Sequence, residues 1–243
     1  MIRGALYLIW FVVSVIPYAL VLIVTSFTLG GQPAYRVARA WLSQMTAAAR
    51  VFGGIKYEVE GMENLPDAES MEPVILCPKH QSTWETFAFP ALMSHPLAYV
   101  FKKELLMIPF FGWSIGRLDM VHIDRSQRAK AWTKVAEQGK ELMSRGVWII
   151  MFPEGTRAER GQQGKYKSGA SRLAVTTGAN LVPIAVTSAR CWPRATFRMT
   201  PGTIRISIAP PIPAVGREAD ELMKEAEAWI EAEMRRLDPE AYA

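Results

Sequence analysis

Residues 5–29 form an almost unbroken run of aliphatic and aromatic side chains, and no charged residue occurs from Gly4 to Tyr35. As a helix rising about 1.5 Å per residue, this run would extend roughly 37 Å, against about 30 Å for the hydrocarbon core of a bilayer. The run is too long for a signal peptide and lacks a small-residue cleavage site near its end. We therefore predict a membrane segment, either one tilted span or, because Pro17 lies near its middle, a kinked or re-entrant hairpin. A buried core helix is the alternative.

The next segment has the spacing of an amphipathic helix. Its apolar side comprises Val37, Ala38, Trp41, Leu42, Met45, Ala48, Ala49 and Phe52, and its polar side comprises Arg36, Arg39, Ser43 and Arg50. Such a helix can lie along a bilayer with its arginines at the phosphate level, or it can pack on the soluble part of the chain. Lys and Arg are more frequent after the apolar run than before it, which favours a cytoplasmic catalytic portion. We expect residues 1–54 to form a membrane-anchoring helical region and residues 55–243 to form one domain.

The composition narrows the class of protein. The chain has 243 residues, which suffice for one catalytic domain with a small attachment. A formal net charge of +5 suits anionic partners such as lipid surfaces and phosphorylated substrates. Cys77 and Cys191 lack CxxC spacing, so neither a disulfide framework nor a zinc site is expected. The basic residues are scattered, and no nucleic-acid-binding motif occurs.

Beyond residue 55, short apolar runs alternate with helical patterns. Strands are predicted over residues 74–77, 97–101, 120–123, 147–152, 181–186 and 204–208. Helices are predicted over residues 83–93, 126–145, 169–177 and 218–237, and residues 157–169 are expected to form a flexible loop. This alternation predicts an α/β domain, in which a mixed central sheet is flanked by helices, behind the N-terminal membrane-anchoring helical segment.

His80 stands between a strand-like run and a predicted helix, and Glu85 follows within the same segment. A histidine is a natural base near neutral pH, and a carboxylate can orient its ring and stabilise the imidazolium. On one regular helix the two side chains would point apart, so they meet only if His80 precedes the helix and Glu85 lies in its first turn. Ser82 is a good N-cap for such a helix. The spacing of Ser82 and Glu85 is also that of a capping box, in which Glu85 would bond to the backbone of Ser82.

The motif Phe-Pro-Glu-Gly-Thr-Arg, residues 152–157, directly follows a predicted buried strand. The Pro and Gly predict a tight turn that presents Glu154, Thr156 and Arg157 at the carboxyl end of the strand, where α/β sheets bind ligands. Arg157 can hold a phosphate through two parallel hydrogen bonds. An ordinary surface turn with an internal Glu154–Arg157 pair is the alternative.

These segments resemble the motifs of the glycerolipid acyltransferase superfamily, particularly the bacterial 1-acylglycerol-3-phosphate acyltransferases. The resemblance lies in the His-x4-acid segment, followed in the chain by Phe-Pro-Glu-Gly-Thr-Arg. Two further blocks are similar in order: Lys102-Lys103-Glu104-Leu105 with Ile108, Pro109 and Gly112, and Gly116 through Ile123-Asp124-Arg125. Val-Pro-Ile-Ala at residues 182–185 resembles the last block. One position departs from the family, which usually has Asp where this chain has Glu85.

The resemblance implies transfer of a fatty acyl group from a thioester, acyl-CoA or acyl carrier protein, to the sn-2 hydroxyl of lysophosphatidic acid. The product would be phosphatidic acid for phospholipid biosynthesis, made at the cytoplasmic side of the inner membrane. His80 would be the general base, Glu85 would hold its ring, and amides near the start of the His80 helix would stabilise the oxyanion. No metal or other cofactor is expected beyond the acyl donor. The residues expected to bind substrate are Lys103, Arg125, Glu154, Gly155, Thr156 and Arg157, with Glu154 acting by fixing the turn or neighbouring basic groups.

Several alternatives remain at this level, among them a different lysolipid acceptor and a non-catalytic lipid-binding scaffold. Gly112-Trp113-Ser114-Ile115-Gly116 matches the nucleophile elbow of serine hydrolases, but a strand is expected after it where that fold needs a helix. Arg160, Lys165 and Lys167 in the predicted loop would suit an acidic acyl carrier protein. His95 and His122 are expected to be structural.

Overall fold

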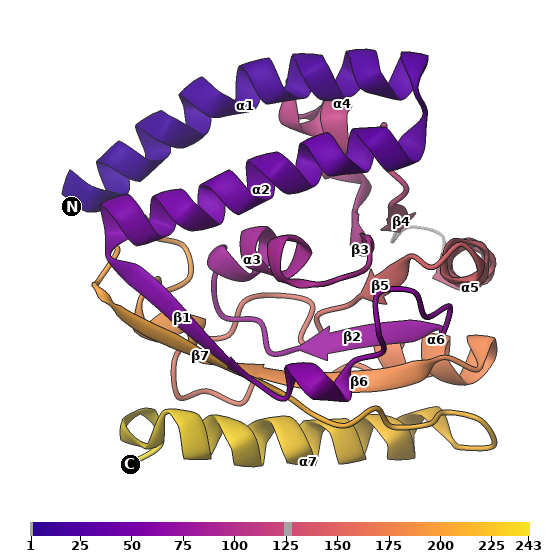
Figure 1. Cartoon of the computed structure of the whole chain (residues 1–243). Coiled ribbons are helices and arrows are strands. Elements are labelled where there is room, and N and C mark those ends of the chain that lie inside the picture. Colours follow the sequence, from indigo (N-terminus) through magenta and orange to yellow (C-terminus); the bar gives the residue numbers. More distant parts are fainter. Residues whose placement is uncertain (1, 124–127) are drawn as a thin grey trace.

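The computed structural model of the chain describes residues 2–123 and 128–243 (Figure 1). It begins with two helices, α1 (Ile2–Thr28) and α2 (Gly31–Gly53), which run side by side as a hairpin. Pro17 lies inside α1, which continues through it. The start of α1 packs on the rest of the protein: the Tyr7 ring lies edge-on to Trp192, and a Cβ on Gly4 would collide with the carbonyl of Phe197.

Within the described residues, α1 is the one helix long and apolar enough to cross a membrane. Its exposed large apolar side chains include Ile2, Ile9, Val12, Val13, Leu20, Val21, Val24 and Phe27. By contrast, the apolar side of α2 is buried against α1 and α3 (Trp84–Leu92). Trp41 of α2 donates a hydrogen bond to Ser14 of α1 at 3.0 Å. Of the two arrangements predicted for the amphipathic segment, α2 therefore takes the one in which it packs on the protein.

Seven strands of the described chain form one sheet in the order β1-β7-β6-β2-β5-β3-β4, in which only β6 and β7 are antiparallel. Their bounds are β1 (Ile55–Glu60), β2 (Val74–Pro78), β3 (Leu97–Lys102), β4 (Val121–Ile123), β5 (Trp148–Ile150), β6 (Asn180–Val186) and β7 (Gly202–Ile208). Leu76 of the central β2 pairs with Ile150 on one side and Val182 on the other.

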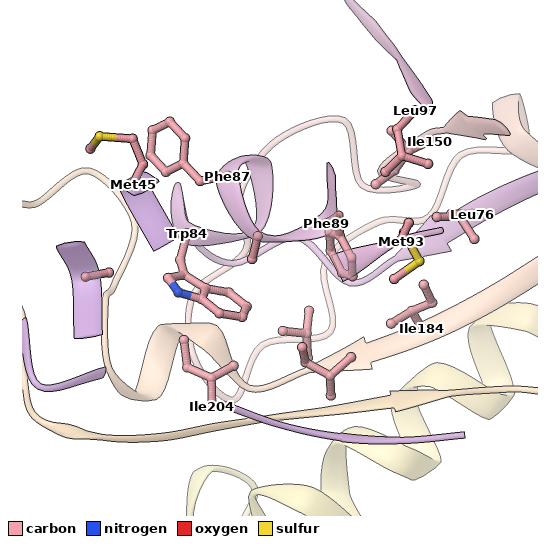
Figure 2. Close-up of a cluster of buried hydrophobic side chains, with 14 of the residues drawn as sticks. Met45, Leu76, Trp84, Phe87, Phe89, Met93, Leu97, Ile150, Ile184 and Ile204 are labelled. Carbon is pink, nitrogen blue, oxygen red and sulfur yellow. The ribbon is translucent and has the colours of Figure 1, made fainter. Parts of the chain in front are cut away.

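Helices cover both faces of this sheet (Figure 1). The hairpin and α3 lie over one face, where Leu76, Ile150 and Ile184 of the strands belong to one buried cluster with Trp84 and Phe89 of α3 (Figure 2). The other face is covered by α5 (Arg128–Ser144), α6 (Gly169–Thr177) and α7 (Ala219–Leu237). The remaining helices are short: α4 (Phe111–Ile115), η1 (Met62–Asn64), η2 (Lys103–Met107), η3 (Ser188–Arg190) and η4 (Pro239–Ala241). Burial on both faces explains why the central strands are uninterrupted apolar runs in the sequence.

The predicted α/β fold with a mixed central sheet is confirmed, and each predicted strand and helix has a counterpart within a few residues. The strand β1 was not predicted, because three of its six residues are charged and only Ile55 is buried. The short helix α4 was also missed, since its five residues are too few to show a helical period.

Candidate active site

Three neighbouring parallel strands bring the motif residues to one edge of the sheet. β5 and β6 both pair with β2 in parallel, so the loops that follow these strands meet at the carboxyl edge. His80 and Glu85 follow β2, Arg157 follows β5, and Ser188 follows β6. In open α/β sheets this edge is the usual place for ligand binding.

The His80 ring and the Glu85 carboxylate form a hydrogen-bonded pair. Nδ1 of His80 lies 2.5 Å from Oε2 of Glu85. Glu85 is fully buried, and the mostly buried ring of His80 stacks on Phe152 with 3.8 Å between ring centroids. A carboxylate at Nδ1 holds the proton there, which leaves the lone pair on Nε2 at the other side of the ring. An imidazole so arranged can take a proton from a hydroxyl group.

The Glu85 carboxylate also accepts hydrogen bonds from backbone amides just before α3. Its Oε1 accepts hydrogen bonds from the amides of Gln81 at 2.9 Å and Ser82 at 2.8 Å. The predicted bond between the Ser82 amide and Glu85 therefore occurs together with the pairing to His80, although the N-cap of α3 is Thr83 and not Ser82 as predicted. The amide of His80 itself donates to Glu154. Because these three amides are occupied, the expectation that amides at the start of the His80 helix stabilise the oxyanion is wrong for residues 80–82.

A third side chain, Ser188, joins the pair and was not predicted. It is fully buried, and its hydroxyl donates a short hydrogen bond to Oε1 of Glu85. With Oε1 held by three donors, Oε2 faces the imidazole of His80. No local pattern could indicate this contact, since it joins residues 103 positions apart. Its single sequence signal is the place of Ser188 just after a predicted strand.

The turn after β5 is fastened to the His80 loop. Gly155 has a φ of +66°, a left-handed conformation that suits glycine. The amide of Ala158 donates to the carbonyl of His80 at 2.7 Å, and Oε1 of Glu154 accepts from the amide of His80 at 3.3 Å. The two predicted motifs thus lie against each other. Glu154 is buried, and its contact with the backbone of His80 links the turn after β5 to the His80 loop.

Lys79, next to His80 in the chain, is fully buried among acceptors. Its Nζ lies 2.5 Å from Oε1 of Glu231, 2.6 Å from the carbonyl of Gln163 and 3.5 Å from Oε1 of Glu154. Glu231 belongs to α7, so Lys79 joins the C-terminal helix to both motif loops. Burial raises the pKa of Glu154 to about 7, although the charge of Lys79 acts in the opposite direction. Burial dominates because Lys79 lies closer to Glu231, and Oε2 of Glu154 has no hydrogen-bond partner among the described residues.

His80 lines a pocket of about 600 Å³, called the histidine pocket below. Its polar lining includes Thr156, Arg157, Lys167 and Arg194, and Gly155 also contributes. In the part of the chain that the structure describes, the buried Nε of Arg157 has no hydrogen-bond partner. The guanidinium of Arg157, which lines the pocket, therefore keeps an unused hydrogen-bond donor. A guanidinium is permanently charged and matches the geometry of a phosphate.

A second hollow of about 340 Å³, called the apolar cavity, adjoins the histidine pocket. It lies between the helical hairpin, α3, α4 and β3, and most of its lining is aliphatic or aromatic. The two hollows share the residues Thr86, Tyr99, Phe101, Leu105 and Arg157. Removing an alkyl chain from water into the apolar cavity would contribute a favourable free energy of about 25 cal/mol per Å² of buried apolar surface. The cavity can therefore hold a fatty chain whose polar end lies at His80.

Two of the predicted substrate-binding residues are not placed. Arg125 lies outside the described residues, and of Lys103 only the backbone is described, at the start of η2. The structural prediction for His95 is confirmed: its buried ring stacks on Trp148, and its Nε2 lies 2.8 Å from the carbonyl of Ser70.

The sequence features that suggested other functions have structural roles. Ser114 lies within α4, and its hydroxyl donates to the carbonyl of Phe110 at 2.7 Å. Arg160, one of the three loop residues considered for binding an acyl carrier protein or as part of a solvated loop, is paired with Asp238 through contacts of 2.7 and 2.8 Å. This pair and the hydrogen bonds from Lys79 hold the loop at residues 157–169, which was predicted to be flexible, against the rest of the protein. Within the described residues, no group of three or more His, Cys, Asp or Glu side chains is placed to hold a metal ion.

Comparison with known proteins gives the family. The model of a family described as Acyltransferase matches residues 56–187. The 1-acyl-sn-glycerol-3-phosphate acyltransferase of Pseudomonas aeruginosa is 42% identical over 206 residues, which are 84% of this chain and 78% of that protein. A chloroplastic 1-acyl-sn-glycerol-3-phosphate acyltransferase of Arabidopsis thaliana is 28% identical over 210 residues, which are 86% of this chain and 57% of that longer protein.

The fold also matches a solved structure. It is similar to the crystal structure of the 1-acyl-sn-glycerophosphate acyltransferase from Thermotoga maritima, with a TM-score of 0.80 and 24% sequence identity. The match covers 97% of this chain and 95% of that one. The family match takes in the His80 and Arg157 loops and spans more than half of the chain, so this protein belongs to the Acyltransferase family.

Proposed function

We propose that the protein transfers a fatty acyl group from a thioester donor, acyl-CoA or acyl carrier protein, to the sn-2 hydroxyl of lysophosphatidic acid. The product is phosphatidic acid. The observation that carries the proposal is the His80–Glu85 pair, whose ring lines a pocket together with Arg157 and adjoins the apolar cavity. The relative from Pseudomonas aeruginosa, which is named for this activity, supports the choice of acceptor.

In the reaction, Nε2 of His80 removes the proton from the sn-2 hydroxyl while the hydroxyl oxygen attacks the thioester carbonyl. The carbon–sulfur bond of the tetrahedral intermediate then breaks, and the thiolate leaves. A parent thiol pKa of roughly 8.5 means that this thiolate needs little help from an acid. The proton on the imidazolium passes to the thiolate or to solvent, which restores the base. Glu85 holds the ring through Nδ1 and offsets the positive charge that forms.

The apolar and the charged parts of the substrates bind to different residues around His80. A fatty chain occupies the apolar cavity, and the acceptor phosphate binds to Arg157, with Arg125 and Lys103 as the further predicted cations. The exposed aliphatic side chains of α1 contact the lipid of the inner membrane on its cytoplasmic side. The acceptor then reaches the histidine pocket from the bilayer, and its acyl chain need not enter water. The reaction uses no metal or other cofactor in this scheme.

A panel assay with the purified full chain in detergent tests the proposal. Radiolabelled acyl-CoA and acyl carrier protein thioesters are offered with lysophosphatidic acid and with lysolipids that carry other head groups. We expect phosphatidic acid as the main product and a loss of roughly a hundredfold or more in His80→Ala, the usual contribution of a general base. The melting temperature of the variant controls for its folding.

Two results would contradict the proposal. Transfer that survives His80→Ala would remove the base, and a preference for a lysolipid without a terminal phosphate would remove the role of Arg157. A fluorophosphonate probe provides a further check, because stoichiometric labelling of Ser114 with loss of activity would support a serine hydrolase instead.

A further inference from the structure

A third hollow adjoins the histidine pocket and is lined by several cationic side chains. This lysine–arginine pocket has a volume of about 370 Å³ and is lined by Arg157, Lys165, Lys167 and Arg194. It shares Thr156, Arg157, Lys167 and Arg194 with the histidine pocket. Two carboxylates, Glu154 and Glu159, also line it, but Glu154 is buried and faces Lys79.

The cations of this pocket are held beside the turn after β5. Nη1 of Arg194 donates to the carbonyl of Arg157 at 2.8 Å. The next residue, Ala195, has a φ of +55°, a left-handed conformation that non-glycine residues keep only where their surroundings require it. Nζ of Lys167 lies over the same turn, since a Cβ on Gly155 would be 2.8 Å from it. Lys167 and Arg194 have no carboxylate within ion-pair distance among the described residues, so their charges are available to a ligand.

The three hollows follow one another in the order of the chemical groups of an acyl thioester. The apolar cavity suits the fatty chain, the histidine pocket holds the base that the thioester carbonyl must approach, and the lysine–arginine pocket comes last. The donor has the same sequence of parts: acyl chain, reacting carbonyl, neutral pantetheine arm and phosphate. In lysophosphatidic acid, by contrast, the phosphate and the reacting hydroxyl are on adjacent carbons. Its phosphate must therefore stay inside the histidine pocket, which Lys167 and Arg194 also line. The donor phosphate is a pantetheine arm away from the reacting carbonyl, so it can lie in the lysine–arginine pocket, of which His80 is not part.

We infer that Lys167 and Arg194 bind the phosphate at the end of the pantetheine arm of the acyl donor, a group that acyl-CoA and acyl carrier protein share. The inference rests on the proposed function. It assigns the acceptor phosphate to Arg157 and the donor phosphate to the opposite side of the same turn. An ammonium and a guanidinium give a phosphate charge-assisted hydrogen bonds from two directions.

Two synthetic donors that differ only in the phosphate test the inference: acyl-phosphopantetheine and acyl-pantetheine. Wild-type protein is expected to have a KM for acyl-phosphopantetheine about tenfold or more below that for acyl-pantetheine. Lys167→Ala and Arg194→Ala should each raise the KM for the phosphorylated donor about tenfold. For Lys167→Ala, the KM for acyl-pantetheine and that for lysophosphatidic acid should change less than about twofold. Arg194→Ala also removes the hydrogen bond to the carbonyl of Arg157, so its effect on the KM for lysophosphatidic acid is compared with that of Lys167→Ala. Arg198→Ala is the matched control. Arg198 is an exposed arginine in the same loop as Arg194, but it lines none of the three hollows.

Each other result counts against the inference. If the variants raise the KM for lysophosphatidic acid instead, the two residues bind the acceptor phosphate. An equal effect on both donors, or a wild-type protein that does not distinguish them, means that the residues bind no donor phosphate. Failure of the proposed function is distinguishable, since wild-type protein would then form no phosphatidic acid from either donor.

Discussion

Replacement of Ser188 by alanine should slow acyl transfer while the fold survives. In the structure the Ser188 hydroxyl donates to Oε1 of Glu85, and both side chains are fully buried. After Ser188→Ala, Oε1 keeps the amides of Gln81 at 2.9 Å and Ser82 at 2.8 Å as donors. No buried polar atom is therefore left without a partner. The change acts on how firmly the carboxylate is held against the imidazole of His80.

The size of the effect follows from the kind of bond that is lost. A hydrogen bond to a charged group contributes about 1.5–3 kcal/mol, and each 1.4 kcal/mol corresponds to a factor of ten in rate. If Ser188 acts through the orientation of Glu85, kcat should fall roughly 10- to 100-fold. KM should stay unchanged, because Ser188 lines none of the three hollows. A purely structural role would instead lower the amount of active protein and the melting temperature.

A double-mutant cycle with Glu85→Gln separates these two roles. Kinetics with saturating lysophosphatidic acid and acyl-CoA would be measured for the two single variants, the double variant and wild type. We expect Ser188→Ala to have little further effect once Glu85 is replaced, since its partner carboxylate is gone. Ser207→Ala, which removes a buried serine of β7, is the control for loss of a buried hydroxyl. Independent, multiplying effects of the two substitutions on kcat would refute the reasoning.

Two further predictions concern the buried charges beneath the reaction centre. Lys79→Met should lower the free energy of unfolding by about 3–5 kcal/mol in urea titrations, because it leaves Glu231 buried without its partner at 2.5 Å; a loss below about 1 kcal/mol would contradict the importance of this pair. For Glu154, burial raises the pKa from 4.5 to about 7, so in this interval the folded protein binds more protons than the unfolded chain. Wild-type protein should therefore lose roughly 3 kcal/mol of stability relative to Glu154→Gln as pH rises from about 4.5 to about 7. Urea titrations at several pH values check this, and a constant difference between the two proteins would rule it out.

The parts of the site that the sequence predicts are those that follow strands with a strong apolar pattern. The apolar patterns of residues 74–77 and 147–152 predict buried strands, and therefore predict that the residues after them lie at the edge of a sheet. That the two strands are neighbours could not be deduced from their own patterns. In the structure Ile75 of β2 pairs with Ile149 of β5, and this pairing of the two strands brings His80 and Arg157 into one pocket.

Contacts between distant segments explain what sequence reasoning missed. Lys79 and Glu231 are 152 positions apart, and nothing in a run of ordinary helical residues singles out Glu231 as the partner of a buried lysine. The hairpin likewise depends on tertiary contact. The period of residues 37–52 indicates an apolar side, but that side could face lipid or protein equally well until α3 is known to lie beneath it.

Glu85 shows why two interpretations of one sequence pattern need not exclude each other. A glutamate three residues after Ser82 is the pattern of a capping box, in which the side chain reaches back to the backbone of the first residue. In the structure this reach brings Oε1 to the amides of Gln81 and Ser82, and the second oxygen of the same carboxylate meets Nδ1 of His80. The capping bonds fix the carboxylate plane, and the fixed plane aims Oε2 at the imidazole. The glutamate that departs from the usual aspartate is therefore compatible with holding the base, since its longer side chain bonds the start of the helix and the histidine at once.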